Sequence, residues 1–238
     1  MPYLNPARLN TIDPTAFNTR KPYPWVNPSG VLLDQAYQQL VDTLPDVSAF
    51  ASSFGEQRKY GQDPHDRFLL EYTGRTRLAS PWKEFVHELQ QPLYRQFLQR
   101  MFGVRSVALR FHWLYTPAGC SVSPHCDGEN ELGTHLFYFN TAQDWDPTWG
   151  GSTLILDDGQ RLSPKTAPAF DDFDTETPSE FIGNYSLLFK RTEHAWHGVR
   201  ELRCPAGRLR KLFSVIVASG ERSDRFIRLW NRPRYQYF

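Results

Sequence analysis

Two histidines and one aspartate in this chain have the types and spacing that a non-haem iron site requires. His125 and Asp127 are separated by one residue, and His197 lies far downstream. Side chains alternate between the two faces of an extended chain, so His125 and Asp127 point the same way. Two imidazoles and one carboxylate can occupy one face of an octahedral ferrous ion, leaving three positions for a chelating co-substrate and dioxygen. These residues suggest a non-haem iron oxygenase.

Other histidines compete for the same role. His194 lies just before His197, but the pair Gly198-Val199 that follows His197 favours His197 as the distal ligand. We interpret His112 and His135, which fall in expected strands near the site, as packing residues or as residues that support the metal ligands, because the site needs no third imidazole. A His-x-Asp pair with a distant histidine also arises by chance among surface or hydrogen-bonded residues. The assignment therefore depends on the elements that surround it.

The composition indicates one folded domain. The chain has 238 residues, of which 40% are hydrophobic and 15% aromatic, and no linker or repeat divides it, so we predict a single domain over 1–238. A net charge of +1 disfavours nucleic acid and anionic membranes as partners. The sequence shows no signal peptide, no apolar run long enough to span a bilayer, and no disulfide or zinc pattern among its three cysteines. We therefore expect a soluble, cytoplasmic protein, and its oligomeric state stays open.

The first part of the chain, residues 1–104, is predicted to be a mainly helical cap. Residues 31–44 carry apolar side chains at helical spacing, and Pro45 ends the segment. A second helix is expected from Pro81, a residue suited to a first helical turn, and Pro92 should divide or kink it.

After residue 104 the periodicity changes from helical to alternating. Short apolar strands separated by Gly, Pro and Asp clusters are typical of a jelly-roll barrel. We predict a mainly β protein, a double-stranded β-helix of the cupin kind over 105–220, flanked by the N-terminal helices, with the candidate ligands at strand ends where the barrel opens. The expected strands are 106–115, 136–140, 152–156, 185–189 and 211–217, with a further candidate at 67–72.

Several motifs in the barrel region occur in a characteristic order. They are Tyr115-Thr116-Pro117-Ala118-Gly119, His125-Cys126-Asp127, Phe137-Tyr138-Phe139-Asn140, Asp144-Trp145-Asp146, Trp149-Gly150-Gly151-Ser152-Thr153-Leu154, Asn184 to Phe189, His197-Gly198-Val199 and a late basic strand. In this order they resemble the 2-oxoglutarate- and Fe(II)-dependent dioxygenases, specifically the prolyl-4-hydroxylase-like branch. The resemblance spans about residues 105–220.

The resemblance implies a cofactor set and a ligand set. Fe(II) would be held by the two histidines and the aspartate, with 2-oxoglutarate and O2 as co-substrates and ascorbate as an optional addition. Arg210 would bind the distal carboxylate of 2-oxoglutarate, for which the planar fork of arginine is suited. Tyr138 would donate its hydroxyl to the same carboxylate, and Tyr115 would line the co-substrate pocket. Arg208 has the same strand parity as Arg210 and stays an alternative, because the turn after the distal histidine is longer than in the family; Lys211 has the opposite parity.

Such an enzyme would hydroxylate an unactivated carbon and release succinate and CO2. The substrate, peptidyl (prolyl in particular) or a small molecule, stays open, and so does a non-catalytic metal-binding jelly roll with a regulatory or interaction role. The segment 160–183 contains an acidic cluster at 171–176 and could be a lid or a solvated loop. The basic and aromatic tail 221–238 is expected to pack on the barrel.

Overall fold

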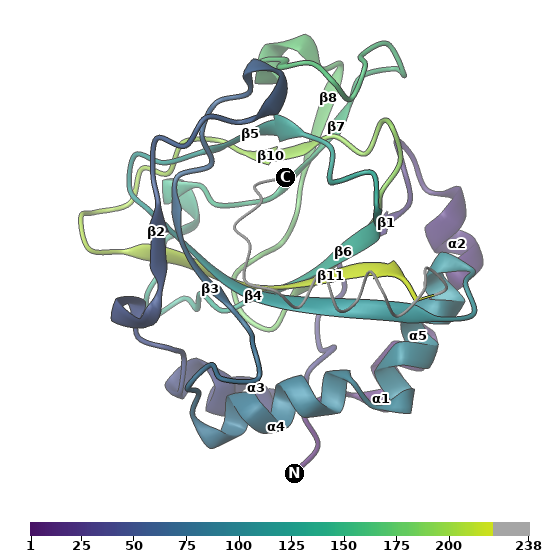
Figure 1. The fold of residues 1–238 in the computed structure, drawn as a ribbon, viewed down its shortest axis with the longest axis vertical. Helices are drawn as coiled ribbons and strands as arrows, with labels where there is room; N and C mark the ends of the chain where they lie inside the picture. The colour runs from purple at the N-terminus through teal and green to yellow at the C-terminus, as the bar shows by residue number, and fades with distance from the viewer. Residues whose placement is uncertain (221–238) are drawn as a thin grey trace.

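Two antiparallel β-sheets face each other in the computed structural model, which describes residues 1–220 (Figure 1). The large sheet has the strand order β1-β9-β6-β11-β4-β3-β2, and the small sheet has the order β5-β10-β7-β8. The large sheet comprises β1 (Trp25–Val26), β2 (Ala51–Ser53), β3 (Arg67–Glu71), β4 (Val107–Pro117), β6 (Glu131–Tyr138), β9 (Ser186–Lys190) and β11 (Leu209–Ser219). The small sheet comprises β5 (Val122–His125), β7 (Leu154–Asp157), β8 (Thr175–Pro178) and β10 (His197–Val199). The predicted jelly-roll class is confirmed.

The long strands β4 and β11 form the centre of the large sheet and sort their side chains onto two faces. They pair along their full lengths, from Leu209 opposite Pro117 to Ser219 opposite Val107. Alternation along β11 directs Leu212, Ser214 and Ile216 towards the space between the sheets. The intervening residues Phe213, Val215 and Val217 are fully buried on the other face.

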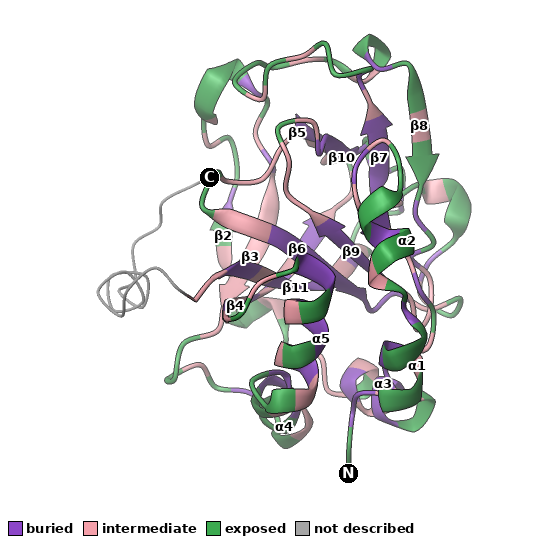
Figure 2. Cartoon of the chain, turned by 90° about the vertical axis from the view of Figure 1, so that its right-hand side faces the viewer, coloured by how far each residue is buried: buried purple, intermediate pink, exposed green. Residues whose placement is uncertain are grey.

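Helices cover that other face of the large sheet (Figure 1). They are α1 (Pro6–Thr11), α3 (Asp34–Asp42), α4 (Ser80–Leu89) and α5 (Pro92–Phe102), whereas α2 (Pro14–Thr19) packs on α5 and β1 at the edge of the sheet. The core between helices and sheet is aromatic: the ring of Trp82 lies 5.2 Å from that of Trp113 and 5.4 Å from that of Phe213, centroid to centroid. Figure 2 shows the inner sides of these helices buried and their outer sides exposed.

Proline and glycine determine where the helices begin and end. Ser80 and Pro81 open α4, and Pro92 opens α5, so the predicted interruption at Pro92 is confirmed. Gly103 ends α5 with φ at +69°, a left-handed conformation that glycine adopts without strain. The helix predicted over 31–44 is shorter than expected and forms α3.

The boundary predicted at residue 104 is not a structural boundary. Strands β1, β2 and β3 come from the N-terminal part and complete the large sheet, with β3 paired to β4 and β1 paired to β9. Residues 1–104 are thus only in part a helical cap. Strands of two or three residues leave no periodic signal, which is why β1 and β2 escaped prediction, whereas β3 matches the expected strand 67–72.

Two other expectations concern membrane-spanning helices and the C-terminal tail. Within residues 1–220, none of the helices is long and apolar enough to cross a bilayer. The tail 221–238, expected to pack on the barrel, lies outside the described residues.

Candidate metal centre and co-substrate pocket

The small sheet brings the three predicted metal ligands together. His125 ends β5, His197 begins β10, and the two residues are direct partners in the antiparallel pairing of these strands. Asp127 follows β5 by two residues. Its Oδ1 lies 3.7 Å from Nε2 of His125 and 3.5 Å from Nε2 of His197. All three ligand atoms lie within 4.8 Å of one another, and this is the group that the described part of the chain offers for a metal ion.

Hydrogen bonds aim the ligand atoms at a common point. The Nδ1 of His125 lies 2.9 Å from the carbonyl oxygen of Ser123, and the Nδ1 of His197 lies 3.0 Å from that of Ala195. Nδ1 must therefore donate in both rings, which leaves the lone pair of each Nε2 available. Thr134 donates its hydroxyl to Oδ2 of Asp127 at 2.7 Å, so Oδ1 is the oxygen left to coordinate.

The environment keeps the His125 imidazole in the form that a metal needs. Burial, and next the nearby His197 and His65, hold the pKa of His125 well below its usual range, so the ring is neutral near pH 7. Two imidazole nitrogens and one carboxylate oxygen suit a ferrous ion, with open positions on the cavity side. The residues present fit the metal that the motif predicts.

Aromatic rings support the ligands from behind. The ring of Phe189 lies 4.5 Å from that of His197, and the ring of His65 lies 4.5 Å edge-on to that of His125. His65 also lies 3.0 Å through Nε2 from the Ser123 hydroxyl. Sequence reasoning missed His65 because it lies in the irregular segment before β3, where no spacing relates it to a ligand.

A cavity of about 210 Å³ lies between the sheets and contains the triad at its wall. Four leucines line it, one each from β3, β4, β6 and β11. Leu69 pairs with Leu114, and Leu114 pairs with Leu212, so three of them form one row across the sheet. The fourth is Leu136. These side chains give the cavity an apolar wall alongside its charged groups.

Arg210 lies in the same cavity as the triad. It is 3% exposed, and its guanidinium donates from Nε to the carbonyl of Gly151 at 2.6 Å and from Nη2 to Oγ1 of Thr153 at 2.9 Å. Burial lowers the pKa of Arg210, yet an arginine retains its proton in proteins. Within residues 1–220 no carboxylate forms an ion pair with it. A buried cation therefore faces the cavity without an acidic partner among the described residues.

Tyr138 and Arg210 meet at one threonine. The Tyr138 hydroxyl donates to Oγ1 of Thr153 at 2.8 Å and lies 3.1 Å from Oγ of Ser179. Arg210 donates to the same Thr153 oxygen, and its guanidinium carbon lies 5.7 Å from the centre of the Tyr138 ring. The structure thus brings two predicted co-substrate residues together. Thr153 and Ser179 were missed as functional candidates, although Thr153 lies in a motif that the sequence singles out.

The alternative basic residues point elsewhere. Arg208 is exposed in the turn before β11. Lys211 lies on the opposite face of β11, where its Nζ forms an ion pair of 2.6 Å with Asp144. Strand parity thus leaves Arg210 as the basic residue of β11 that enters the cavity.

Tyr115 does not line the cavity, so the role predicted for it in the co-substrate pocket is wrong. Its ring packs on Phe50 at 4.3 Å, and its hydroxyl donates to the carbonyl of Pro45 at 3.1 Å, on the helical side of the large sheet. The neighbouring Thr116 faces the cavity instead. Tyr115 lies near the end of a strand, as predicted. Successive side chains in an extended chain lie on opposite faces, however, so the cavity receives the next residue instead.

The remaining histidines are separate from the metal ligands. Nδ1 of His194 lies 2.9 Å from the carboxylate of Asp158. His135 is buried behind the sheet, 2.8 Å from the Tyr94 hydroxyl. His112 lines the cavity with its Nε2 3.8 Å from Glu71.

The acidic segment 160–183 is joined to the small sheet by β8, which pairs with β7. Arg161 forms an ion pair with Asp174 at 2.9 Å, and Arg200 forms ion pairs with Asp171 and Glu176. These acidic side chains therefore have partners on this side of the barrel.

Solved structures with the same fold include two prolyl hydroxylases and an α-ketoglutarate-dependent carbocyclase. A prolyl-4-hydroxylase from Pseudomonas putida is 14% identical, with a TM-score of 0.57 over 90% of this chain and 98% of its own. A prolyl hydroxylase from Trichoplax adhaerens, in complex with a peptide fragment of hypoxia inducible factor, is 16% identical, with a TM-score of 0.62 over 90% of each chain. The non-haem α-ketoglutarate-dependent carbocyclase SnoK from nogalamycin biosynthesis is 10% identical, with a TM-score of 0.61 over 94% of this chain and 93% of its own.

No protein-family model matches the sequence, and no curated protein matches it at a significant level. The likeness therefore lies in the fold. The chain has the double-stranded β-helix of the prolyl hydroxylases and other 2-oxoglutarate- and Fe(II)-dependent oxygenases, as its motifs predicted.

Proposed function

We propose that this protein is an Fe(II)- and 2-oxoglutarate-dependent oxygenase that hydroxylates an unactivated carbon. The observation that carries the proposal is Arg210, a buried cation that shares one cavity with the His125–Asp127–His197 triad and has no acidic partner within residues 1–220. A cavity that only held a metal ion would have no use for such an arginine, because burying a charge without a partner is costly.

The cavity matches 2-oxoglutarate group by group. The guanidinium of Arg210 supports a carboxylate, and the Thr153 and Tyr138 hydroxyls beside it add hydrogen-bonding capacity. The leucine row through Leu114 and Leu212 suits the two methylene groups between the carboxylates. The keto-acid end is a bidentate chelator, for which a facial triad leaves adjacent positions.

Once bound, iron and 2-oxoglutarate would supply the activation of O2, and the products would include succinate and CO2. The protein's own residues would bind and orient. Arg210 holds the distal carboxylate, Thr134 fixes the Asp127 carboxylate, and the leucines exclude water from the chelate. Ascorbate would serve as an optional reductant. The cytoplasm, where thiols stay reduced, suits the three free cysteines.

Anaerobic titration with Fe(II) and 2-oxoglutarate tests the proposal. The chelate gives a weak visible charge-transfer band, which we expect in the wild type and not in His197→Ala. Arg210→Met should retain Fe(II) binding but weaken 2-oxoglutarate by about 100-fold, since it removes a charge-assisted bidentate contact. Arg208→Met, on the exposed turn, is the matched control and should behave as the wild type.

Two outcomes would count against the proposal. If iron binds without any charge-transfer band at saturating 2-oxoglutarate, the protein is better described as a metal-binding jelly roll with an interaction role. If the Arg210→Met and Arg208→Met variants bind 2-oxoglutarate equally well, the carboxylate site has been assigned to the wrong residue.

A further inference from the structure

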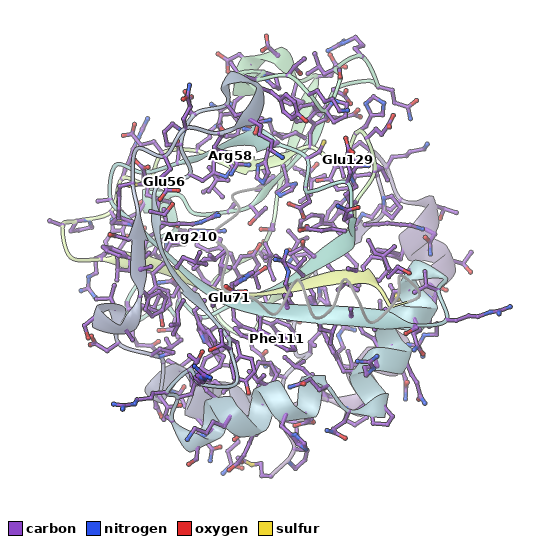
Figure 3. The ribbon with its side chains drawn as sticks, in the orientation of Figure 1. Glu56, Arg58, Glu71, Phe111, Glu129 and Arg210 are labelled. Carbon is purple, nitrogen blue, oxygen red and sulfur yellow. The ribbon has the colours of Figure 1, made fainter. Side chains whose placement is uncertain are left out.

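Three polar side chains form a row across the inner face of the large sheet. Glu71 on β3 is paired with His112 on β4, and His112 is paired with Ser214 on β11. Directly paired residues have their side chains on the same face of a sheet, and all three line the cavity. Figure 3 shows Phe111, the residue before His112, on the side of the helices and Glu71 further from them. We call Glu71, His112 and Ser214 the polar row.

The polar row lies between the leucine row and the metal ligands. Ser214 follows Leu212 by two residues and precedes Ile216 by two residues on the same face of β11. Ile216 is paired with Thr134, whose hydroxyl holds the Asp127 carboxylate. The other two residues of the polar row lie on β4 and β3, further from β6 by about 5 Å per strand. They take no part in the proposed chelation of iron and 2-oxoglutarate.

The polar row makes few hydrogen bonds. Ser214 is only 4% exposed, and within residues 1–220 its hydroxyl has no hydrogen-bond partner. Nε2 of His112 lies 3.8 Å from the Glu71 carboxylate, a distance longer than a hydrogen bond, and the ring has no closer polar partner in the described part of the chain. Buried polar groups are nearly always hydrogen-bonded, so these groups on the cavity wall are available to a ligand.

The donors and acceptors of the polar row determine which ligand fits. Burial lowers the pKa of His112, so its ring is neutral near pH 7 and offers one donor and one acceptor. The Ser214 hydroxyl also donates and accepts, whereas an ionised carboxylate only accepts. The neighbouring His112 and the charge of Arg110 hold the pKa of Glu71 below its usual range, so Glu71 is ionised. Arg110 itself pairs with Glu131 at 3.4 Å.

Hydroxyl groups satisfy all three residues because each hydroxyl both donates and accepts. A carboxylate on the ligand only accepts, and the charge of Glu71 would repel it. A protonated amine could donate to Glu71, but it has no lone pair for the N–H of His112 and would meet the charge of Arg110. An aliphatic ligand would leave all three polar groups buried without partners.

We propose that the polar row binds the hydroxyl groups of a small polyhydroxylated molecule, which is the substrate. This deepens the proposed function and rests on it, because the polar row lies beside the site where iron and 2-oxoglutarate would bind. The cavity of about 210 Å³ must also hold the co-substrate, so a compact ligand fits it. A site that hydrogen-bonds hydroxyls rejects analogues that lack them, because its own polar groups are then left unpaired.

Compounds that share a six-membered ring provide a direct test. Protein loaded anaerobically with Fe(II) and saturating 2-oxoglutarate is titrated with cyclohexane-1,2-diol and, in parallel, with cyclohexylamine and cyclohexanecarboxylate. N-acetylprolinamide represents a prolyl peptide. We expect the diol to perturb the charge-transfer band at concentrations at least about tenfold lower than the other three compounds. Tighter or equal binding of any of the three, or no binding of the diol, overturns the proposal.

Variants assign the site to its residues. His112→Phe retains a ring without nitrogens, and Glu71→Gln retains the shape without the charge. Each should weaken the diol about tenfold while the affinity for 2-oxoglutarate stays unchanged. His87→Phe, on the exposed side of α4, is the matched control and should change neither affinity. Wild-type affinity for the diol in both His112→Phe and Glu71→Gln would contradict the assignment.

Ser214→Ala separates ligand binding from a structural role. It should weaken the diol about tenfold without lowering the thermal midpoint of the unliganded protein, because the hydroxyl has no partner within residues 1–220 to lose. A lower midpoint together with wild-type affinity for the diol would assign this hydroxyl to stability and remove it from the site.

A second readout separates this inference from the proposed function. The thermal midpoint of Mn(II)-loaded protein, measured with 2-oxoglutarate present, should rise with the diol and not with cyclohexanecarboxylate. If no charge-transfer band forms with Fe(II), the oxygenase proposal fails, whereas a diol-specific rise that His112→Phe removes still establishes the hydroxyl site. If the band forms and the diol has no effect in either assay, the oxygenase stands and the hydroxyl site is wrong.

Discussion

At the scale of single residues, two tyrosines from β4 and β6, the strands on either side of β11, show how strongly strand parity governs function. Tyr138 reaches Thr153 beside Arg210, whereas Tyr115 reaches the carbonyl of Pro45 behind the sheet. Both hydroxyls donate a hydrogen bond, and burial raises the pKa of both phenols, so neither ionises near pH 7. Their chemistry is alike, and only the face of the sheet distinguishes them.

This difference predicts that replacing each tyrosine by phenylalanine affects a different property of the protein. Tyr138→Phe should weaken 2-oxoglutarate about tenfold, because it removes a hydroxyl from the network that holds Arg210. Tyr115→Phe is the matched control: it should cost about 1 kcal/mol of folding free energy and leave 2-oxoglutarate affinity unchanged. Isothermal titration and urea denaturation measure the two quantities, and an equal loss of affinity in both variants would contradict the assignment.

His135 predicts a pH dependence of stability. It is fully buried, and burial lowers its pKa from 6.5 to about 3. Between these two values the unfolded chain binds a proton at this ring and the native chain does not. Stability should therefore fall as the pH decreases below about 6.5, by about 1.4 kcal/mol per pH unit from this residue alone.

The variant His135→Phe should reduce that slope by about one proton. Urea denaturation of metal-free protein between pH 4.5 and 7 measures the slope in both proteins. Other buried histidines contribute equally to both, so the difference isolates His135. Tyr94→Phe removes its hydrogen-bond partner, retains the imidazole and should keep the wild-type slope. An unchanged slope in His135→Phe would show that the ring is protonated in the native protein.

At the scale of elements, the metal site depends on close packing around β10. An added Cβ at Gly198 would lie 2.8 Å from the carbonyl oxygen of Val122 on β5 and 3.0 Å from the ring of Phe170. Because backbone cannot give way as a flexible side chain can, Gly198→Ala should push β10 from β5 and separate His197 from His125. We expect iron affinity to fall by about tenfold or more.

Gly74→Ala is the control for this prediction. No atom lies within 4 Å of an added Cβ at Gly74, so iron affinity and stability should stay as in the wild type. A fluorescence or absorbance titration with Fe(II) under anaerobic conditions compares the two variants. Equal iron affinity in Gly198→Ala and Gly74→Ala would mean that β10 can shift without moving its ligand.

At the scale of the whole molecule, the helical layer supports the cavity through the large sheet. Trp82 of α4 is fully buried, donates its Nε1 hydrogen to the carbonyl of Leu40, and contacts Phe213. Phe213 lies between Leu212 and Ser214, which line the cavity on the other face. The helices thus determine the position of the wall that would hold the co-substrate.

Loss of this contact should destabilise the entire domain. Trp82→Ala is expected to lower the free energy of unfolding by about 3–5 kcal/mol, since it removes a large buried side chain and leaves a cavity. His87→Ala, on the exposed side of the same helix, should change it by less than about 0.5 kcal/mol. Urea denaturation monitored by circular dichroism compares the two variants. Similar midpoints would show that neighbouring side chains fill the space left by the indole ring.

The sequence predicted those features that follow from local rules. His125 and Asp127 share a face because they are two residues apart, and Arg210 could be separated from Lys211 by the same alternation. Tyr115 was assigned to the wrong face of the sheet. Alternation shows which residues share a face, but only the pairing of β4 with β11 shows which face lines the cavity. Strands β5 and β10 are too short for a periodic pattern, although they carry the ligands.

The central strands of the two sheets differ in the number of residues that they pair, and this difference should affect the dynamics of the protein. Strands β4 and β11 share eleven paired positions, whereas β10 meets β5 at His197 and Val199 and meets β7 at two positions. The small sheet should therefore open by local unfolding, with its amide hydrogens exchanging long before those of the large sheet. An ion that joins β5 to β10 would link two strands that share only two paired positions, so iron should slow amide exchange there and leave the β4–β11 amides unchanged. Hydrogen–deuterium exchange with and without metal would show it, and uniform protection across both sheets would contradict it.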